Sequence, residues 1–188
     1  MAAVIGWYKL RLAVRCLQVG GVIAYPTEAV YGLGCDPLSQ GAVQRIRDLK
    51  GRPARKGLIL VAADFGQLLP FVEPLDAARM AHVFGSWPGP VTWLLPARRT
   101  TSPLLTGPHS TLAVRVTAHP VAAALCRAWG GALVSTSANR SGRPPARTGL
   151  QVRLRLGPQV DFLLNGPCGG RSRPSTIRDG RSGAEVRP

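Results

Sequence analysis

Short apolar runs alternate along this chain with segments in which apolar residues recur every three or four positions. The continuous run at 58–62 is typical of a strand buried on both faces. Segment 7–17 instead has the spacing of an amphipathic helix. Because such alternation joins strands through helices, the sequence predicts an α/β fold with a twisted, mixed open sheet flanked by helices.

No internal repeat or change of composition marks a linker, and 188 residues with 45% hydrophobic content can bury one sizeable core. We therefore expect a single domain over 1–188. Strands are predicted at 22–25, 58–62, 91–95, 111–116, 132–135, 160–164 and 176–178, with a hairpin turn at Asp179-Gly180. Helices are predicted at 7–17, from Ser39 to before Pro53, between Asp64 and Pro70, and at 75–84, 120–129 and 150–156, with a long loop at 97–110.

Several protein classes are excluded at this stage. No apolar run is long enough to cross a bilayer, and Lys9, Arg11 and Arg15 interrupt the N-terminal apolar residues, unlike a secretory signal. We expect a cytoplasmic protein without membrane contact. The four cysteines form no CxxC motif and no Cys/His cluster, which argues against a zinc site or a disulfide framework, so no metal ligands are predicted.

Familiar catalytic motifs are also absent. The chain has no GxxxxGK[ST], GxGxxG or HExxH. His82, His109 and His119 lie near no serine or cysteine nucleophile motif, so each is expected to be structural or at the surface. A hydrolase built on a nucleophile and a base therefore has little support.

The charge distribution favours anionic partners. The net charge is +15, and segment 77–160 holds ten arginines without a single acidic residue. A surface this unbalanced attracts polyanions. Nucleotide, RNA or both would fit, and charge alone does not choose between them.

The stretch 24–36, AYPTEAVYGLGCD, is the first candidate for a ligand site. It crowds proline, threonine, glutamate and tyrosine where a buried strand is predicted to end, and ligands bind at strand ends in open α/β sheets. Gly32 and Gly34 let the backbone turn sharply or approach a ligand closely. We expect a glycine-rich loop here.

Cationic and hydroxyl-rich segments follow other predicted elements. The basic stretch 50–56 can grip a triphosphate or be a solvated turn, and 135–142, STSANRSG, offers hydroxyls and an amide for a nucleotide or forms an ordinary turn. Arg115 falls inside a strand, where it needs a partner anion from the protein or a ligand. Segment 166–173, with three glycines and two arginines, is expected to be either a mobile anion-seeking flap or a plain surface loop.

These motifs together resemble one family. YPTEAVYGLG, Lys50-x-Arg52, KGLILVA, WPGPVTW, LAVRVTAHP, STSANRSG and PSTIRD occur in that order, and the set resembles the YrdC/TsaC family of threonylcarbamoyl-AMP synthases. The similarity runs from about residue 21 to 188 and looks like the short bacterial TsaC form. It implies a single YrdC-like domain.

The resemblance implies a reaction as well. L-Threonine, bicarbonate and ATP, with Mg²⁺ bridging the phosphates, would give threonylcarbamoyl-AMP and pyrophosphate. This nucleotidyltransferase reaction serves threonylcarbamoyl modification of the tRNA adenosine beside the anticodon, which partner transfer proteins complete. Both sides of the reaction are anionic, so catalysis needs positioning and positive charge more than a strong base.

Site residues are carried over by motif. The family's Lys-x-Arg and Ser-x-Asn signature falls on Lys50, Arg52, Ser137 and Asn139, which are expected to be catalytic and to bind ATP. Further ATP-binding positions are Lys56, Thr111 and Arg187. The threonine-binding positions are Thr27, Arg115, Ser135 and Ser175.

Three positions depart from the family pattern. Ala29 replaces a second threonine, Gly57 replaces a proline, and Val61 lies near a position that is histidine in longer members. The threonine pocket is therefore expected to be built differently. The alternatives are a non-catalytic double-stranded RNA-binding or ribosome maturation factor and a relative that activates carbamoyl phosphate, although such relatives usually sit in much larger chains.

Overall fold

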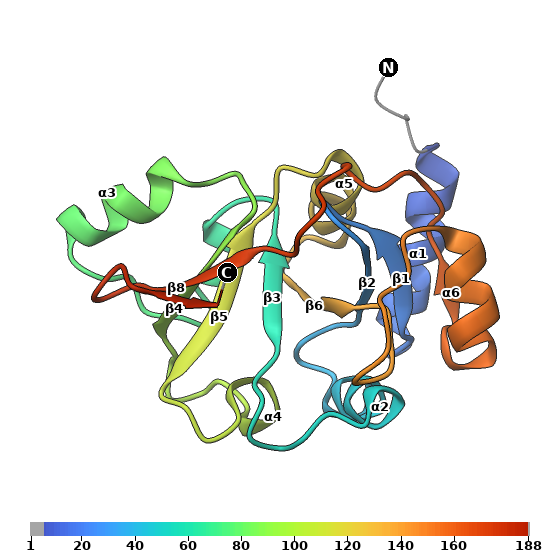
Figure 1. Cartoon of the computed structure of the whole chain (residues 1–188), viewed down its shortest axis with the longest axis horizontal. Coiled ribbons are helices and arrows are strands. Elements are labelled where there is room, and N and C mark those ends of the chain that lie inside the picture. The colour runs from blue at the N-terminus through green and yellow to red at the C-terminus, as the bar shows by residue number, and fades with distance from the viewer. Residues whose placement is uncertain (1–5, 188) are drawn as a thin grey trace.

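The computed structural model describes residues 6–187 of the chain and shows a mixed nine-stranded sheet with helices on both faces (Figure 1). The strand order is β7-β1-β2-β6-β3-β5-β4-β8-β9. Three neighbouring pairs are parallel (β1 with β7, β3 with β5, β4 with β8) and the others are antiparallel. The predicted α/β fold with a mixed open sheet is confirmed.

The strands are short, as the apolar runs predict. Their bounds are β1 Ile23–Pro26, β2 Tyr31–Gly34, β3 Ile59–Ala62, β4 Val91–Pro96, β5 Thr111–Val116, β6 Leu133–Ser137, β7 Phe162–Leu163, β8 Thr176–Asp179 and β9 Glu185–Arg187. The helices are α1 Trp7–Gln18, α2 Gln40–Lys50, α3 Ala77–Gly85, α4 Pro103–Thr106, α5 Pro120–Trp129 and α6 Gly149–Leu156, with 3₁₀ turns η1 Gly66–Leu68 and η2 Gly157–Gln159.

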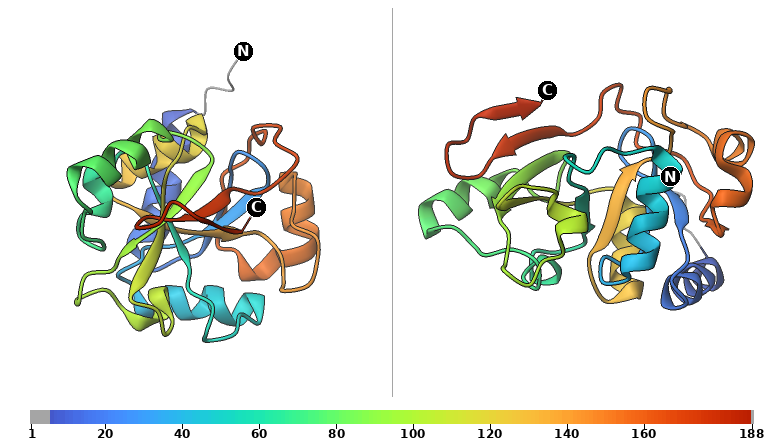
Figure 2. Two further views of the ribbon diagram at one scale, coloured as in Figure 1. Left: turned by 60° about the vertical axis from the view of Figure 1, so that its left-hand side comes forward. Right: turned by 90° about the horizontal axis from the view of Figure 1, so that it is seen from below.

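Alternating side chains of the central strands fill two cores. On β1, Ile23 and Tyr25 face the cluster formed with α1 and α5, whereas Ala24 faces the cluster formed with α2 and α6. On β3, Val61 joins the first cluster and Leu60 the second. The helices therefore cover both faces of the sheet, as the two further views show (Figure 2).

The expected glycine-rich loop after β1 is wrong, because residues 31–34 form β2, which pairs antiparallel with β1 and with β6. The glycines allow close strand packing here. A Cβ on Gly34 would lie 2.6 Å from the Val134 carbonyl oxygen and 2.7 Å from the ring of Tyr25. At Gly34 the backbone does approach a neighbour closely, as the glycine suggests, but the neighbours are Val134 and Tyr25 of the protein and not a ligand.

Other element boundaries differ in smaller ways. Helix α2 ends at Lys50 because Gly51 adopts a left-handed conformation, not because of Pro53. The predicted loop 97–110 contains the short helix α4, whose N-cap Ser102 accepts from Leu104 N. The hairpin turn after Asp179 is confirmed, and it leads into β9, which was not predicted. No helix within 6–187 is long and apolar enough to cross a membrane.

One connection crosses the whole sheet. Strand β7 is at one end of the strand order and β8 is next to β9 at the other end, and residues 164–175, here called the strap, join β7 to β8. In Figure 1 the strap runs from beside α6 over the strands to β8. It covers the edge of the sheet where β1 and β2 meet the end of β6.

Candidate functional site

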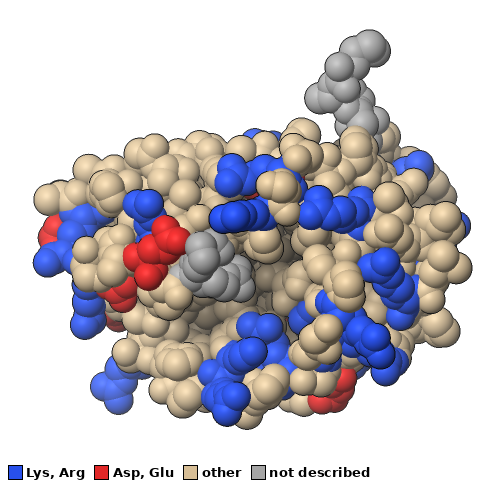
Figure 3. Space-filling model, viewed as in Figure 1, with Lys and Arg blue, Asp and Glu red and all other residues tan. Residues whose placement is uncertain are grey.

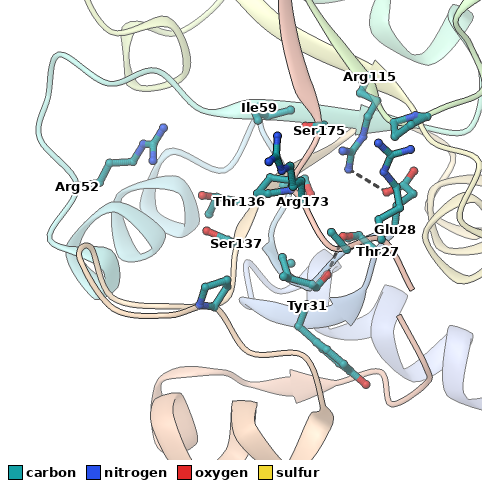
Figure 4. Close-up of a pocket in the computed structure, with 18 residues that line it drawn as sticks. Thr27, Glu28, Tyr31, Arg52, Ile59, Arg115, Thr136, Ser137, Arg173 and Ser175 are labelled. Atoms are coloured by element: carbon teal, nitrogen blue, oxygen red, sulfur yellow. Dashed lines mark hydrogen bonds and ion pairs between the residues drawn. The ribbon is translucent and has the colours of Figure 1, made fainter. Parts of the chain in front are cut away.

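A cavity of about 280 Å³ opens between the β1–β2 hairpin, the end of β6 and the strap. Figure 4 shows its lining, with Arg52 on one side and the Glu28–Arg115 pair on the other. The lining residues are Thr27, Glu28, Ala29, Val30, Tyr31, Gly32, Arg52, Ile59, Pro90, Arg115, Ser135, Thr136, Ser137, Pro145, Arg171, Arg173, Pro174 and Ser175.

All four residues predicted to bind threonine line this cavity. Thr27 follows β1, Arg115 lies on β5, Ser135 on β6, and Ser175 ends the strap. Each of the four is buried. The Thr27 hydroxyl donates to Val30 O at 2.7 Å, and the Thr92 hydroxyl donates to Ser175 Oγ at 3.0 Å. These bonds fix the two hydroxyls in place.

Arg115 finds the anion that its buried position requires in Glu28, with Arg115 Nη2 3.3 Å from Glu28 Oε2. Thr117 Oγ1 also donates to Glu28 Oε1 at 2.7 Å. Burial on its own raises the pKa of Glu28, but the Arg115 charge and the Thr117 hydroxyl outweigh it, so the pKa lies below its ordinary value. Glu28 is therefore an ionised carboxylate in the cavity wall, a role that the motif search did not assign.

Lys50 lies outside the cavity lining and is buried. Its Nζ donates to Ser137 O at 2.5 Å, to Asn139 O at 2.8 Å and to Asn139 Oδ1 at 3.0 Å. Burial, with a smaller contribution from the Arg52 charge, lowers the pKa of Lys50 to about 8. Lys50 therefore holds the turn after β6.

Arg52 reaches the cavity from the loop after α2. Its guanidinium donates to the carbonyl of Gly57, with Nε at 3.1 Å. Gly57 packs closely against α4, because a Cβ there would lie 2.9 Å from Thr106 O. Gly57, which replaces the proline of the family pattern, is therefore in tight contact with the backbone of α4.

The strap brings two arginines that were flagged only as part of a possible flap. Arg171 and Arg173 both line the cavity, and Figure 4 shows Arg173 near Ser175 and Thr136. The lining thus carries four guanidinium groups and one carboxylate, which leaves it strongly positive. In Figure 3 the face above the cavity is hollowed and rimmed by lysine and arginine.

Among the described side chains, those of Asn139, Lys56 and Thr111 do not line the cavity. Asn139 lies behind the wall, where its Oδ1 accepts from the Ser137 hydroxyl at 2.6 Å. Lys56 is exposed and Thr111 is half-buried at the start of β5. Arg187 belongs to β9, and its side chain lies outside the described residues.

Two positions that depart from the family pattern are now placed. Ala29 lines the cavity, so the wall carries a methyl group at a position where a threonine would offer a hydroxyl group. Val61 is fully buried in the core formed with α1 and α5 and does not touch the cavity. The difference in the pocket is therefore confined to the hairpin.

The described residues offer no side-chain set for a metal ion. Within 6–187 no group of three or more histidine, cysteine, aspartate or glutamate side chains comes together. The one carboxylate of the cavity, Glu28, already pairs with Arg115. The described residues therefore do not form a side-chain site for a resident Mg²⁺ ion.

Comparison with known proteins identifies relatives over almost the whole chain. The family model for Sua5, YciO and YrdC, described as telomere recombination, matches residues 15–187. A threonylcarbamoyl-AMP synthase of Nitrosococcus oceani is 58% identical over 180 residues, which cover 96% of this chain and 97% of the relative. One from Coxiella burnetii is 50% identical over 175 residues, covering 93% and 94%.

Solved structures agree with this. Sua5 of P. abyssi in complex with L-threonine is 33% identical, with a TM-score of 0.86 over 92% of this chain. The chain spans about half of that protein, covering 51% of it. YciO of E. coli is 28% identical, with a TM-score of 0.83, and the match covers 95% of this chain and 87% of YciO. The resemblance predicted from the motifs is confirmed.

Proposed function

The chain belongs to the Sua5/YciO/YrdC family, and we propose that it is a threonylcarbamoyl-AMP synthase that makes threonylcarbamoyl-AMP, pyrophosphate and water from L-threonine, bicarbonate and ATP. The observation that carries the proposal is the cavity itself, which combines buried hydroxyls with four arginines. Buried hydroxyl groups can bind a small hydroxylated amino acid, and arginines can bind a polyphosphate.

The buried side of the cavity is assigned to threonine. Arg115 lines the cavity together with the hydroxyls of Thr27, Ser135 and Ser175, and guanidinium groups recognise carboxylates through a planar fork. We propose that Arg115 binds the threonine carboxylate while Glu28 holds Arg115 in place. The hydroxyl groups of Thr27, Ser135 and Ser175 then accept hydrogen bonds from, and donate hydrogen bonds to, the polar groups of the substrate.

The outer side is assigned to the triphosphate. Arg52 and Ser137 lie on this side of the cavity in Figure 4, with Arg173 between them and the Glu28–Arg115 pair. The threonine nitrogen bonds to the bicarbonate carbon with loss of water, and the resulting carbamate oxygen attacks the α-phosphorus as the bond to pyrophosphate breaks. Fixed arginines stabilise the charge that develops on the leaving pyrophosphate, which preorganised donors can do without reorganisation.

Magnesium belongs to the substrate in this proposal. The cavity lacks a side-chain set for a metal, so Mg²⁺ is proposed to arrive with ATP, bound by phosphate oxygens and water. Lys50 and Asn139 act indirectly: Lys50 fixes Asn139 and the backbone of Ser137, and so sets the floor of the phosphate side. Lys56, Thr111 and Arg187 are proposed to contact ATP, although only a nucleotide complex would place them there.

The test is pyrophosphate release from MgATP with L-threonine and bicarbonate present together or omitted singly. Release that needs both would support the synthase. No release from folded protein that binds ATP would point to a different acceptor, and no ATP binding would reject the proposal. L-Serine and L-valine in place of threonine show whether the hydroxyl and methyl are both recognised.

Contact with RNA is a second candidate, supported by the lysine and arginine rim in Figure 3. Because the product would serve modification of a tRNA adenosine, the place of action is proposed to be the cytoplasm, with threonylcarbamoyl-transfer proteins as partners. Binding of double-stranded RNA measured at rising salt tests this, since each phosphate contact steepens the salt dependence. A salt-independent signal would reject it.

A further inference from the structure

The strap is fastened along its length. Seven strand intervals separate β7 from β8, or about 34 Å at about 4.8 Å each. Thirteen residue steps from Leu163 to Thr176 reach at most about 45 Å. The strap is therefore long enough to cross these strands, and the hydrogen bonds along its course decide where the residues that it carries lie.

Its anchors are backbone groups bound by the hairpin and by two side chains. Gly169 N donates to Thr27 O at 3.0 Å and Arg171 N donates to Glu28 O at 3.1 Å. Gly166 N donates to the Tyr31 hydroxyl at 3.0 Å, and the same hydroxyl donates to Gly166 O. The expectation of a freely mobile flap does not describe this segment.

His119 supplies a further anchor. Its Nε2 lies 3.2 Å from Pro167 O, between the anchors at Gly166 and Gly169. A carbonyl oxygen only accepts hydrogen bonds, so geometry assigns the proton to Nε2. Burial lowers the pKa of His119 and so favours the neutral ring, in which Nδ1 carries no proton, and Nδ1 is buried without a hydrogen-bond partner among residues 6–187. An unpaired buried acceptor is costly, so the bond from Nε2 must matter enough to keep the ring here.

Helix capping does not explain this histidine. His119 occupies the N-cap of α5, yet its side chain makes no capping hydrogen bond, and Pro120 follows at the first helical position. Its backbone N–H donates to Thr117 Oγ1 at 3.1 Å, the hydroxyl that also donates to Glu28. His119 thus joins the strap to the Glu28–Arg115 pair.

We propose that His119 is a positioning residue whose Nε2–H holds Pro167 and thereby sets Arg171, Arg173 and Ser175 against the substrates. The expected effect of His119 on substrate affinity rests on the proposed function, whereas its expected effect on the position of the strap does not. Without the hydrogen bond from His119 Nε2 to Pro167 O, the strap occupies this position for a smaller fraction of the time. Apparent affinity falls by that fraction, while bound substrate restores the active arrangement.

Two readouts are compared in wild type, His119→Phe, His119→Asn and His119→Gln. Phenylalanine fills the space without a donor, asparagine is too short to reach Pro167, and the glutamine amide reaches the Nε2 position. We expect the KM for L-threonine to rise about 2- to 12-fold in the first two variants, the range for one hydrogen bond. The kcat should stay within about twofold, and glutamine should restore the wild-type KM.

The second readout is tryptic cleavage after Arg171 in the free protein, followed by mass spectrometry. Arg147 donates to the carbonyls of Arg171 and Ser172, so cleavage requires the strap to leave its seat. Cleavage there should accelerate about 2- to 12-fold in the phenylalanine and asparagine variants. Cleavage after Arg181, in the exposed β8–β9 turn, is the internal control and should not change.

Unchanged KM and unchanged cleavage in His119→Phe and His119→Asn would overturn the proposal. Equal impairment in all three variants, glutamine included, would also overturn it, because ring packing and not the donor would then be responsible. If the wild type releases no pyrophosphate, the proposed function fails, and the cleavage comparison still decides whether His119 holds the strap.

Discussion

Lys50 and Asn139 are 89 residues apart in sequence, and Lys50 Nζ lies 3.0 Å from Asn139 Oδ1. The contact ties the end of α2 to the turn after β6. It gives a structural reason for the Lys-x-Arg and Ser-x-Asn motifs to occur together. Lys50 and Asn139 join the end of α2 to the turn after β6, whereas Arg52 and Ser137 of the same two motifs line the cavity.

Replacing Lys50 by methionine should therefore damage the cavity indirectly. The carbonyls of Ser137 and Asn139 would lose their buried donor, and an unsatisfied buried group costs about 1–3 kcal/mol. We expect a lower free energy of unfolding in urea and a weaker affinity for ATP. Methionine has similar length, so packing loss is kept small. Unchanged stability would contradict the role given to Lys50.

The protonation of Lys50 gives a separate prediction about pH. Burial lowers its pKa from 10.5 to about 8, so between these values the unfolded chain binds more protons than the folded one. Stability should therefore rise with pH across that window, by about 1.4 kcal/mol for each unit of the shift. Urea unfolding at pH 7 to 10 measures this. The difference between wild type and Lys50→Met removes contributions from cysteine and tyrosine, and a constant difference would contradict the prediction.

Arg52→Ala should reduce pyrophosphate release by about 10²–10³-fold, the usual effect of deleting one preorganised donor. Arg55→Ala is the matched control, since Arg55 is exposed in the same loop and does not line the cavity. The control should keep its rate within about twofold. Circular dichroism should show both variants folded. Normal turnover by Arg52→Ala would remove Arg52 from the site.

Glu28→Gln should destabilise the protein by about 3–5 kcal/mol at pH 7, because Arg115 stays charged and buried without its partner. The pKa of Glu28 lies below its ordinary value of 4.5, so the stability that it contributes is present above that pH and is lost as pH falls below it. Wild type should therefore lose more stability than Glu28→Gln between pH 5 and pH 3.5. Parallel curves would show that Glu28 does not titrate as an ion pair.

The order of elements could be predicted from sequence because apolar spacing reports burial. The same signal marked 24–36 and 135–142 as polar segments at the ends of predicted strands, and it identified Arg115 as needing an anion. It did not find Glu28 as that anion, since pairing across 87 positions depends on strand order. The strand order also decides that segment 166–173 crosses the sheet.

Residue type alone could not fix the direction of side chains. Lys50 was expected to bind phosphate from its basic stretch and from the family motif, and neither signal showed that its ammonium group also meets the carbonyl oxygens of Ser137 and Asn139. Gly32 and Gly34 were expected in a loop because glycine permits turns. Glycine also permits close contact of strands, and a single sequence does not separate these two uses.

The close contact at Gly34 gives the last prediction. Gly34→Ala would place a Cβ 2.6 Å from Val134 O and 2.7 Å from the Tyr25 ring, and both neighbours are held in the central sheet. Overpacking of this kind costs about 1–3 kcal/mol. Gly41→Ala is the matched control, because Gly41 lies on α2 with nothing within 4 Å of the added atom. There alanine should stabilise by about 0.5–1 kcal/mol through better helix propensity. Thermal unfolding of both variants should shift in opposite directions, and equal shifts would show that β1 and β2 are not packed as closely as this.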